Sequence, residues 1–200
     1  MSKPRLQIIV GSTRPGRVGL PVAVWLHDRA AEHGGFDVEL VDLAVVNLPI
    51  FDEPHHPRLR HYVHPHTKDW STTIERGDAY VFVLPEYNYS FNAATKNALD
   101  YLHQEWQYKP VGFVSYGGLA GGTRAVQAIK QVVTTLKMVP IVESVNVPFV
   151  AQFIDDKRAD GARFVPNETI EDAATAMLDE LEKWAGQLRA LREPAIDAVA

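Results

Sequence analysis

Short apolar segments recur along the chain and alternate with longer segments of helical spacing. The apolar segments are rich in Val, Ile, Tyr and Phe and mostly lack polar alternation, as is typical of strands covered on both faces. We predict five strands, at residues 6–10, 38–43, 79–84, 111–116 and 140–145. We predict helices at residues 18–33, about 67–76, 93–104, 123–138 and 170 to about 191. This regular order of strand and helix predicts an α/β fold with a doubly wound parallel sheet.

The end of the chain predicts one last helix that packs on the sheet. Its apolar residues repeat at helical intervals, and either Asn167 or Thr169 is placed to cap its N-terminus. The sequence shows neither an internal repeat nor a linker rich in Gly, Ser or Pro. We therefore expect residues 1–191 to form a single domain and residues 192–200 to form a flexible tail.

Composition narrows the class of protein. The 200 residues are 46% hydrophobic and 22% charged, which is enough for one buried core. The net charge is −5 and the basic residues are scattered, so a nucleic-acid partner is disfavoured. The chain has no cysteine, which excludes disulfides and thiolate metal sites. No apolar run is long enough for a signal-peptide core or a membrane span, so we expect a cytoplasmic protein with no membrane partner.

The loop after the first predicted strand has the features of a phosphate site. It reads GSTRPGRVG over residues 11–19 and leads directly into a helix, whose free amides and positive dipole end favour a phosphate. Ser12, Arg14 and Arg17 can donate further hydrogen bonds. The lysine of a triphosphate loop and the third glycine of a dinucleotide loop are absent, so one compact phosphate is favoured. The alternative is a connecting turn whose arginines face solvent.

Aromatic and polar side chains follow the third strand, in the sequence PEYNYSFN at residues 85–92. In the strand order 2-1-3-4-5 this loop lies beside the phosphate loop, and the two form one crevice. Tyr87, Tyr89 and Phe91 can form a wall for a flat ring, while Asn88 meets its polar edge. The alternative is that these aromatic side chains only pack against the end of the sheet.

The fourth strand runs into the glycine-rich sequence SYGGLAGGTR at residues 115–124. Glycines allow close approach of the backbone to a ligand, and an amide here can stabilise negative charge on a reduced ring. Taken alone this is a weak signal, since glycine pairs also cap helices and form turns. All three unusual loops, however, follow strands at the edge where open α/β sheets bind ligands.

These three motifs together resemble those of the NADPH-dependent FMN reductase family, a flavodoxin-like group with azoreductase-like, chromate-reductase-like and quinone-reductase-like members. The resemblance covers about residues 5–145. It rests on GSxR at residues 11–14, PEYN at 85–88 leading to KNALD at 96–100, and SYGG at 115–118. It implies a flavodoxin-like three-layer sandwich with a five-stranded parallel sheet of order 2-1-3-4-5.

The resemblance also implies that the chain binds FMN. The phosphate of FMN would meet Ser12, Arg14, Arg17 and the backbone amides of Val18 and Gly19. The isoalloxazine ring would lie between two groups of residues, namely Pro85, Glu86, Tyr87, Asn88 and Tyr89 on one side and Ser115, Tyr116, Gly117 and Gly118 on the other. Many family members carry a small hydroxyl residue at position 17 and asparagine at position 19. Arg17 and Gly19 therefore depart from the family pattern.

The activity implied is an oxidoreductase with NADPH as a transient co-substrate and a small electron acceptor. Quinones, azo compounds, metal oxyanions and free flavin are the candidate acceptors. Because the cofactor carries the chemistry, we assign no catalytic side chain. Arg14, Arg17 and Arg124 can attract the phosphates of NADPH, although an arginine at a loop mouth is more often solvated. The family resemblance also implies a homodimer or homotetramer, with Trp106 and Tyr108 as candidate contact residues.

Two other functions remain open at this level, a flavodoxin-type electron carrier and an FMN-binding regulatory protein. Electron carriers are usually strongly acidic, and a net charge of −5 over 200 residues is mild. A hydrolase is disfavoured because Ser115 lacks the glycine that precedes the nucleophile in a nucleophile elbow.

The long connection after the second strand is rich in histidine. Its histidines, at positions 55, 56, 61, 64 and 66, match no metal-ligand spacing, so we expect a solvated or interface loop and no metal site. We interpret Asp42, Asp52 and Glu53, which begin this connection, as a solvated loop end.

Overall fold

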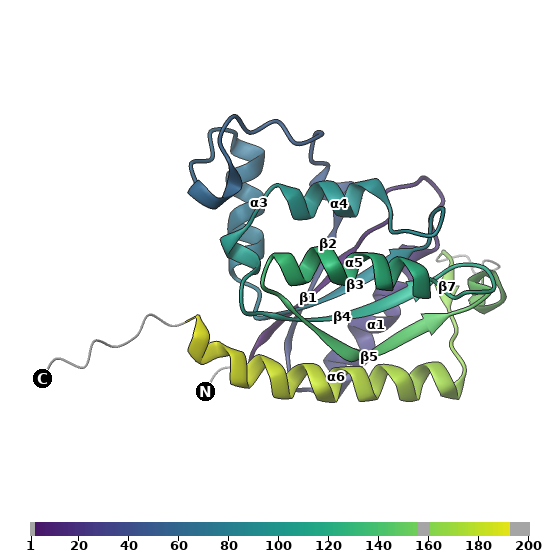
Figure 1. Ribbon diagram of the computed structural model, residues 1–200. Coiled ribbons are helices and arrows are strands. Elements are labelled where there is room, and N and C mark those ends of the chain that lie inside the picture. The colour runs from purple at the N-terminus through teal and green to yellow at the C-terminus, as the bar shows by residue number, and fades with distance from the viewer. Residues whose placement is uncertain (1–2, 156–160, 193–200) are drawn as a thin grey trace, which may run out of the picture.

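Five parallel strands form the central sheet of the computed structural model, which describes residues 3–155 and 161–192 (Figure 1). The strands are β1 (Arg5–Val10), β2 (Asp37–Asp42), β3 (Ala79–Pro85), β4 (Pro110–Tyr116) and β5 (Val139–Val147). Their order across the sheet is β2-β1-β3-β4-β5. The five predicted strands and their flavodoxin-like order are therefore confirmed.

Helices cover both faces of this sheet. One face carries α1 (Gly19–His33) and α6 (Glu168–Leu188), and the other carries α3 (Pro65–Glu75), α4 (Ala93–Asp100) and α5 (Thr123–Thr135) (Figure 1). Side chains along β1 point alternately to the two faces of the sheet. Leu6, Ile8 and Val10 therefore join the core under α1 and α6. Ile9, between them, joins the core under α3, α4 and α5. The predicted three-layer arrangement is confirmed.

Shorter elements occupy the connections. They are α2 (Leu43–Val46), the 3-10 helices η1 (Pro57–Leu59), η2 (Gln104–Trp106), η3 (Val150–Phe153) and η4 (Arg189–Leu191), and the strands β6 (Ile154–Asp155) and β7 (Arg163–Phe164). The strands β6 and β7 pair as an antiparallel hairpin beside α1, where Phe164 meets the Trp25 ring edge to face. Sequence reasoning did not predict this hairpin.

Two predicted helices are shorter than expected, each for a local reason. α4 ends at Asp100, and the chain then forms η2, which turns Trp106 fully into the core against Trp70 and Tyr80. The expectation that Trp106 serves a subunit contact is therefore wrong, because its ring is buried within the chain. α5 ends at Thr135, and Lys137 then adopts a left-handed φ of 60° that a helix cannot continue.

The last helix begins as the sequence predicts, with the Asn167 side chain accepting a hydrogen bond from the Ile170 amide at 3.0 Å. Arg192, which we assigned to a flexible tail, is anchored instead. Its guanidinium donates to the carboxylate of Asp78 at 2.7 Å and to the Asp78 carbonyl at 3.0 Å. The rest of the expected tail, residues 193–200, lies outside the described residues. Among the helices in the described ranges, none is long and apolar enough to cross a membrane.

Candidate functional site

The loops after β1, β3 and β4 meet at the carboxyl edge of the sheet (Figure 1). Gly11 donates from its amide to the Val83 carbonyl at 3.0 Å and accepts at its carbonyl from the buried Asn92 side chain at 2.6 Å. The third loop joins them, since the Glu86 amide donates to the Tyr116 carbonyl at 3.0 Å. The three loops singled out from the sequence therefore form one site.

The first loop leaves the N-terminus of α1 open to a ligand. Val18 precedes the helix without making a side-chain cap, and the first turn contains no acidic residue. The amides of such a turn have no partner within the helix and favour an anion. Ser12, near the start of the same loop, is buried. This end of α1 thus retains the donors that a phosphate monoester needs.

The two arginines of the first loop differ in what surrounds them. Arg17 is mostly buried and forms an ion pair with the carboxylate of Asp42, at the end of β2. The same carboxylate caps α2 by accepting from the Ala44 amide at 3.0 Å. Arg14 is exposed at the mouth of the loop. Arg14 is therefore the freer of the two cations, and the interpretation of Asp42 as a solvated loop end is wrong.

The second loop presents aromatic surface rather than burying it. Tyr87 and Ser90 close a two-residue turn with paired backbone hydrogen bonds of 2.8 and 2.9 Å, and Asn88 and Tyr89 take positive φ within it. Tyr87 is 41% and Tyr89 71% exposed, whereas Phe91 packs against the core. The two tyrosines thus stay available to a flat ligand, and only Phe91 follows the alternative of packing against the sheet.

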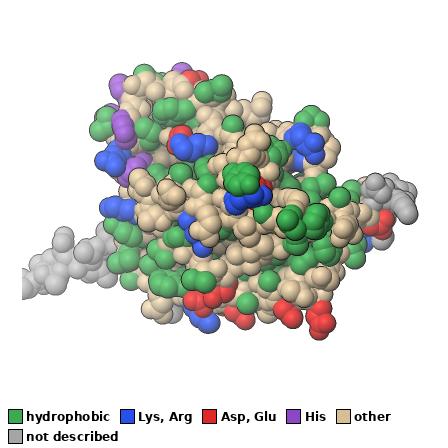
Figure 2. Space-filling model, turned by 45° about the vertical axis from the view of Figure 1, so that its right-hand side comes forward, with side chains coloured by type: hydrophobic (Ala, Val, Ile, Leu, Met, Phe, Trp, Pro, Cys, Tyr) green, Lys and Arg blue, Asp and Glu red, His purple; other side chains and the backbone are tan. Residues whose placement is uncertain are grey.

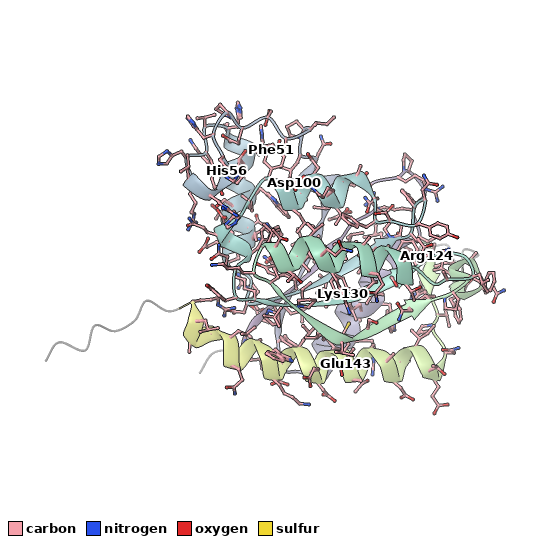
Figure 3. The ribbon with its side chains drawn as sticks, viewed as in Figure 1. Phe51, His56, Asp100, Arg124, Lys130 and Glu143 are labelled. Atoms are coloured by element: carbon pink, nitrogen blue, oxygen red, sulfur yellow. The ribbon has the colours of Figure 1, made fainter. Side chains whose placement is uncertain are left out.

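A charged bridge joins the second loop to the start of α5. The Glu86 carboxylate accepts from the Arg124 side chain at 2.6 Å and from the Arg124 amide at 3.2 Å. The guanidinium also lies 3.8 Å from the centre of the Tyr89 ring, a cation–π contact. Figure 3 shows Arg124 at the N-terminal end of α5. Arg124 is thus held by protein groups, unlike a solvated arginine.

The third loop owes its shape to Ser115, which is fully buried. Its hydroxyl lies 2.8 Å from the Gly121 carbonyl and 2.9 Å from the Asn146 side chain, so it braces the loop instead of facing a ligand. Gly122 has a φ of 85°, and a Cβ there would lie 2.6 Å from the Cβ of Ser115. This position requires glycine.

The two glycines after Tyr116 have different surroundings. The Gly117 amide donates to the Val147 carbonyl at 3.3 Å, while a Cβ on Gly118 would meet nothing within 4 Å. Among the described residues the Gly118 amide has no acceptor, which leaves it available to a ligand. The backbone at Gly118 is therefore the open part of this loop.

Tyr116 reaches from the third loop back to the first. It is 5% exposed, and burial raises the pKa of its hydroxyl to about 12, while a hydrogen bond with the Ser12 side chain acts in the opposite direction. Tyr87, Arg14 and Arg17 also influence this pKa. One side chain thus lies within the electrostatic reach of all the loops.

Sequence reasoning missed two residues that build the site. Asn92 and Thr95 are buried polar residues at the start of α4, and the Thr95 hydroxyl donates to the Asn92 side chain at 2.9 Å. This bond orients the Asn92 amide toward Gly11. A Cβ on Gly11 would lie 2.5 Å from the Thr95 hydroxyl oxygen, so the loop can pass here only as glycine. Asparagine just before a helix predicts an N-cap, but the Asn92 side chain makes no cap hydrogen bond here, so its role was not readable from the sequence.

The histidine-rich connection is folded against the molecule. Buried Glu53 accepts from the amides of Val63 and His64 at 2.9 and 3.0 Å, and Asp52 accepts from Tyr101 and contacts His66, both at 3.0 Å. Histidine side chains gather at the upper left of Figure 2. The described residues contain no group of three or more acidic or histidine side chains arranged to hold a metal. Glu53 organises this segment from a buried position, so the interpretation as a solvated loop end is wrong for Glu53, whereas Asp52 is exposed.

The arrangement at the carboxyl edge fits FMN on structural grounds. It offers an uncapped helix N-terminus beside a buried serine and a free arginine, then exposed tyrosines, then an open glycine backbone. These match in turn a phosphate, a flat ring and the polar edge of that ring. The fold and this sequence of donors define a flavodoxin-like protein.

Comparison with known proteins gives the family. The sequence model of the family described as NADPH-dependent FMN reductase matches residues 4–152, and the chain belongs to this family. It is 37% identical over 194 residues to an NAD(P)H-dependent FMN reductase of Schizosaccharomyces pombe, covering 95% of this chain and 91% of that protein. It is 36% identical over 153 residues to an NAD(P)H-dependent FMN reductase of Nectria sp, covering 74% and 76%.

Among solved structures, the chain is similar to the flavoenzyme FerB, an NAD(P)H:(acceptor) oxidoreductase of Paracoccus denitrificans. The TM-score is 0.72, the sequence identity is 21%, and the match covers 92% of this chain and 98% of that chain. This likeness supports the fold. The family membership makes the protein an oxidoreductase that uses FMN with NAD(P)H as the electron donor.

Proposed function

We propose that FMN binds across the three loops, with its phosphate at the N-terminus of α1. Ser12, Arg14 and the amides of Val18 and Gly19 bind the phosphate, and Arg17 contributes less because Asp42 neutralises it. The observation that carries this proposal is the convergence of the loops through Asn92 and Gly11, at an uncapped helix end.

The ring of FMN lies between the second and third loops. Pro85, Tyr87, Asn88 and Tyr89 form one wall, and Tyr87 and Tyr89 offer exposed aromatic surface there. Gly117 and Gly118 form the other, where the Gly118 amide can stabilise negative charge on the ring. Glu86 and Ser115 serve the site indirectly, since both are committed to bracing the loops.

FMN held by these loops would supply the hydride and electron chemistry, with NADPH as the donor and a small molecule such as a quinone, an azo compound, a metal oxyanion or free flavin as the acceptor. The chain positions the flavin and stabilises charge, and we assign no side chain to proton transfer. The exposed tyrosines favour flat acceptors of varied structure, since one wall of the site is open.

We further propose that the protein acts in the cytoplasm as a homodimer or homotetramer. Apolar side chains on the connection after β2 support an interface, because Val45 and Ile50 are 80% and 89% exposed. Light scattering of the purified protein tests this, and a monomer at all concentrations would refute it.

The direct test of the proposed function is the flavin itself. Purified protein is expected to carry or bind FMN, to show a flavin absorbance band, and to lose that band when NADPH or NADH is added anaerobically. Steady-state assays against quinone, azo, metal-oxyanion and free-flavin acceptors then identify the acceptor class. The proposal is contradicted if the protein binds no added FMN. It is also contradicted if NAD(P)H does not bleach the absorbance of the bound flavin.

A further inference from the structure

The side chain of Tyr116 belongs to the phosphate end of the site rather than to the ring. Tyr116 is the last residue of β4, in the loop that lies against the flavin ring, yet its side chain extends to the first loop. There its hydroxyl faces Gly19, the first residue of α1, and Ser12 lies close enough to influence the ionisation of that hydroxyl.

The contact with Gly19 fixes the position of the hydroxyl. A Cβ built on Gly19 would lie 2.5 Å from the Tyr116 hydroxyl oxygen and 3.2 Å from the ring carbon that bears it. The hydroxyl thus occupies the space that a side chain at position 19 would take. A hydroxyl from β4 therefore stands at the N-terminus of α1.

The surroundings of this hydroxyl favour a hydrogen bond from it to an anion. Arg14 and Arg17 lie close enough to influence its ionisation, and the uncapped N-terminus of α1 lies beside it. A tyrosine hydroxyl is a neutral O–H at physiological pH, and burial raises the pKa of Tyr116 further, so the group can donate a hydrogen bond to an anion. Ser12 is also buried, so both hydroxyls lie in the interior near the N-terminus of α1.

We propose that the Tyr116 hydroxyl donates a hydrogen bond to the phosphate monoester of FMN, together with Ser12, and is a specificity-determining residue for FMN over riboflavin. This inference rests on the proposed function. Because Tyr116 begins the glycine-rich loop, its bond to the phosphate also holds that loop in place beside the ring. Phosphate occupancy and the shape of the ring site are then coupled through one side chain.

The test compares the affinities of FMN and riboflavin, measured by quenching of flavin fluorescence. Tyr116→Phe keeps the ring and removes only the hydroxyl, so FMN binding is expected to weaken about tenfold while riboflavin binding stays unchanged. Tyr108→Phe, remote from the loops, is the matched control and is expected to change neither affinity. Equal weakening of both flavins, or no change for FMN, overturns the inference.

A second variant displaces the hydroxyl without removing it. Gly19→Ala places a methyl group against the Tyr116 hydroxyl, so it is also expected to weaken FMN binding and spare riboflavin. In a Tyr116→Phe background, Gly19→Ala is expected to weaken FMN binding little further, because the hydroxyl that it displaces is already absent. Full additivity of the two losses counts against the inference. If the unmodified protein binds no FMN, the proposed function itself fails, which is a separate result.

Discussion

Asp42 and Arg17 form a largely buried ion pair that joins the end of β2 to the phosphate loop. The ion pair occupies the guanidinium of Arg17, one of the two arginines of the loop. Asp42 also caps α2. Arg17 is therefore a cation whose charge is largely cancelled before any ligand arrives. The two arginines of the loop are consequently unequal, although they look alike in the sequence.

This inequality predicts the order of two substitutions. Arg14→Ala is expected to weaken FMN binding by about tenfold or more, because it removes a charge-assisted phosphate contact. Arg17→Ala is expected to weaken it less, because Asp42 already neutralises that charge. Fluorescence titration at two salt concentrations measures both, and Lys68→Ala, on the exposed start of α3, controls for net charge. A larger loss from Arg17→Ala would contradict this order.

Releasing Arg17 gives the complementary prediction. Asp42→Asn removes the carboxylate charge but keeps an oxygen that can cap α2, so the fold is expected to persist. FMN binding should then tighten by roughly threefold, as an unpaired cation lies near the phosphate. The gain should shrink in high salt. If affinity falls instead, Arg17 depends on Asp42 for its position.

Asn92 is predicted to matter for stability before any ligand binds. Asn92→Ala leaves the Gly11 carbonyl without its side-chain donor, in a buried position, and is expected to lower the free energy of unfolding by about 1–3 kcal/mol. Urea denaturation of the FMN-free protein measures this. The control variant Gln127→Ala, on the exposed side of α5, is expected to change the free energy of unfolding by no more than about 0.5 kcal/mol. Equal stabilities would show that Asn92 does not support the loop.

The fold was predictable because its signals are local. Each buried strand appears as a short apolar run, and the 2-1-3-4-5 order follows from the family resemblance and is confirmed in the sheet. The three loops were predictable as a set, since parallel strands bring their carboxyl ends to one edge.

The roles of individual site residues were less predictable, because their partners lie far away along the chain. The partner of Arg17 is 25 residues away, that of Ser115 is 31 away, and that of Gly11 is 81 away. Ser115 looked like a ligand-facing residue because it stands beside the glycines, and only the position of Asn146 shows that it braces the loop. Trp106 looked like a surface residue because η2 could not be predicted from helical spacing.

The Glu86–Arg124 bridge predicts an asymmetry between its two members. The Glu86 side chain is largely buried and Arg124 is partly exposed. Arg124→Ala therefore leaves a buried carboxylate unpaired, whereas Glu86→Gln leaves an arginine that can reach water. Thermal unfolding is expected to show the larger loss for Arg124→Ala, and a smaller one for the Glu86→Gln/Arg124→Ala double variant. Equal and additive losses would mean that the bridge is not coupled.

Lys109 predicts a pH dependence of stability. Its ammonium is buried, donates to the carbonyls of Ile74 and Glu75 at the end of α3 and to the Tyr80 hydroxyl, and burial lowers its pKa to about 8. In the unfolded chain the pKa is near its ordinary value of about 10.4, so above pH 8 the unfolded state binds more protons than the folded state.

The contribution of Lys109 to the free energy of unfolding is therefore expected to rise between pH 8 and 9.5, with a slope of at most about 1.4 kcal/mol per pH unit. Below pH 8 it should be flat, since both states are protonated. The measurement is urea denaturation of the unmodified protein and of Lys109→Met across pH 7–9.5, a range that stays below the raised pKa of Tyr80. The difference between the two proteins isolates Lys109. A difference that falls with rising pH would show that its hydrogen bonds hold the ammonium charged in the folded protein.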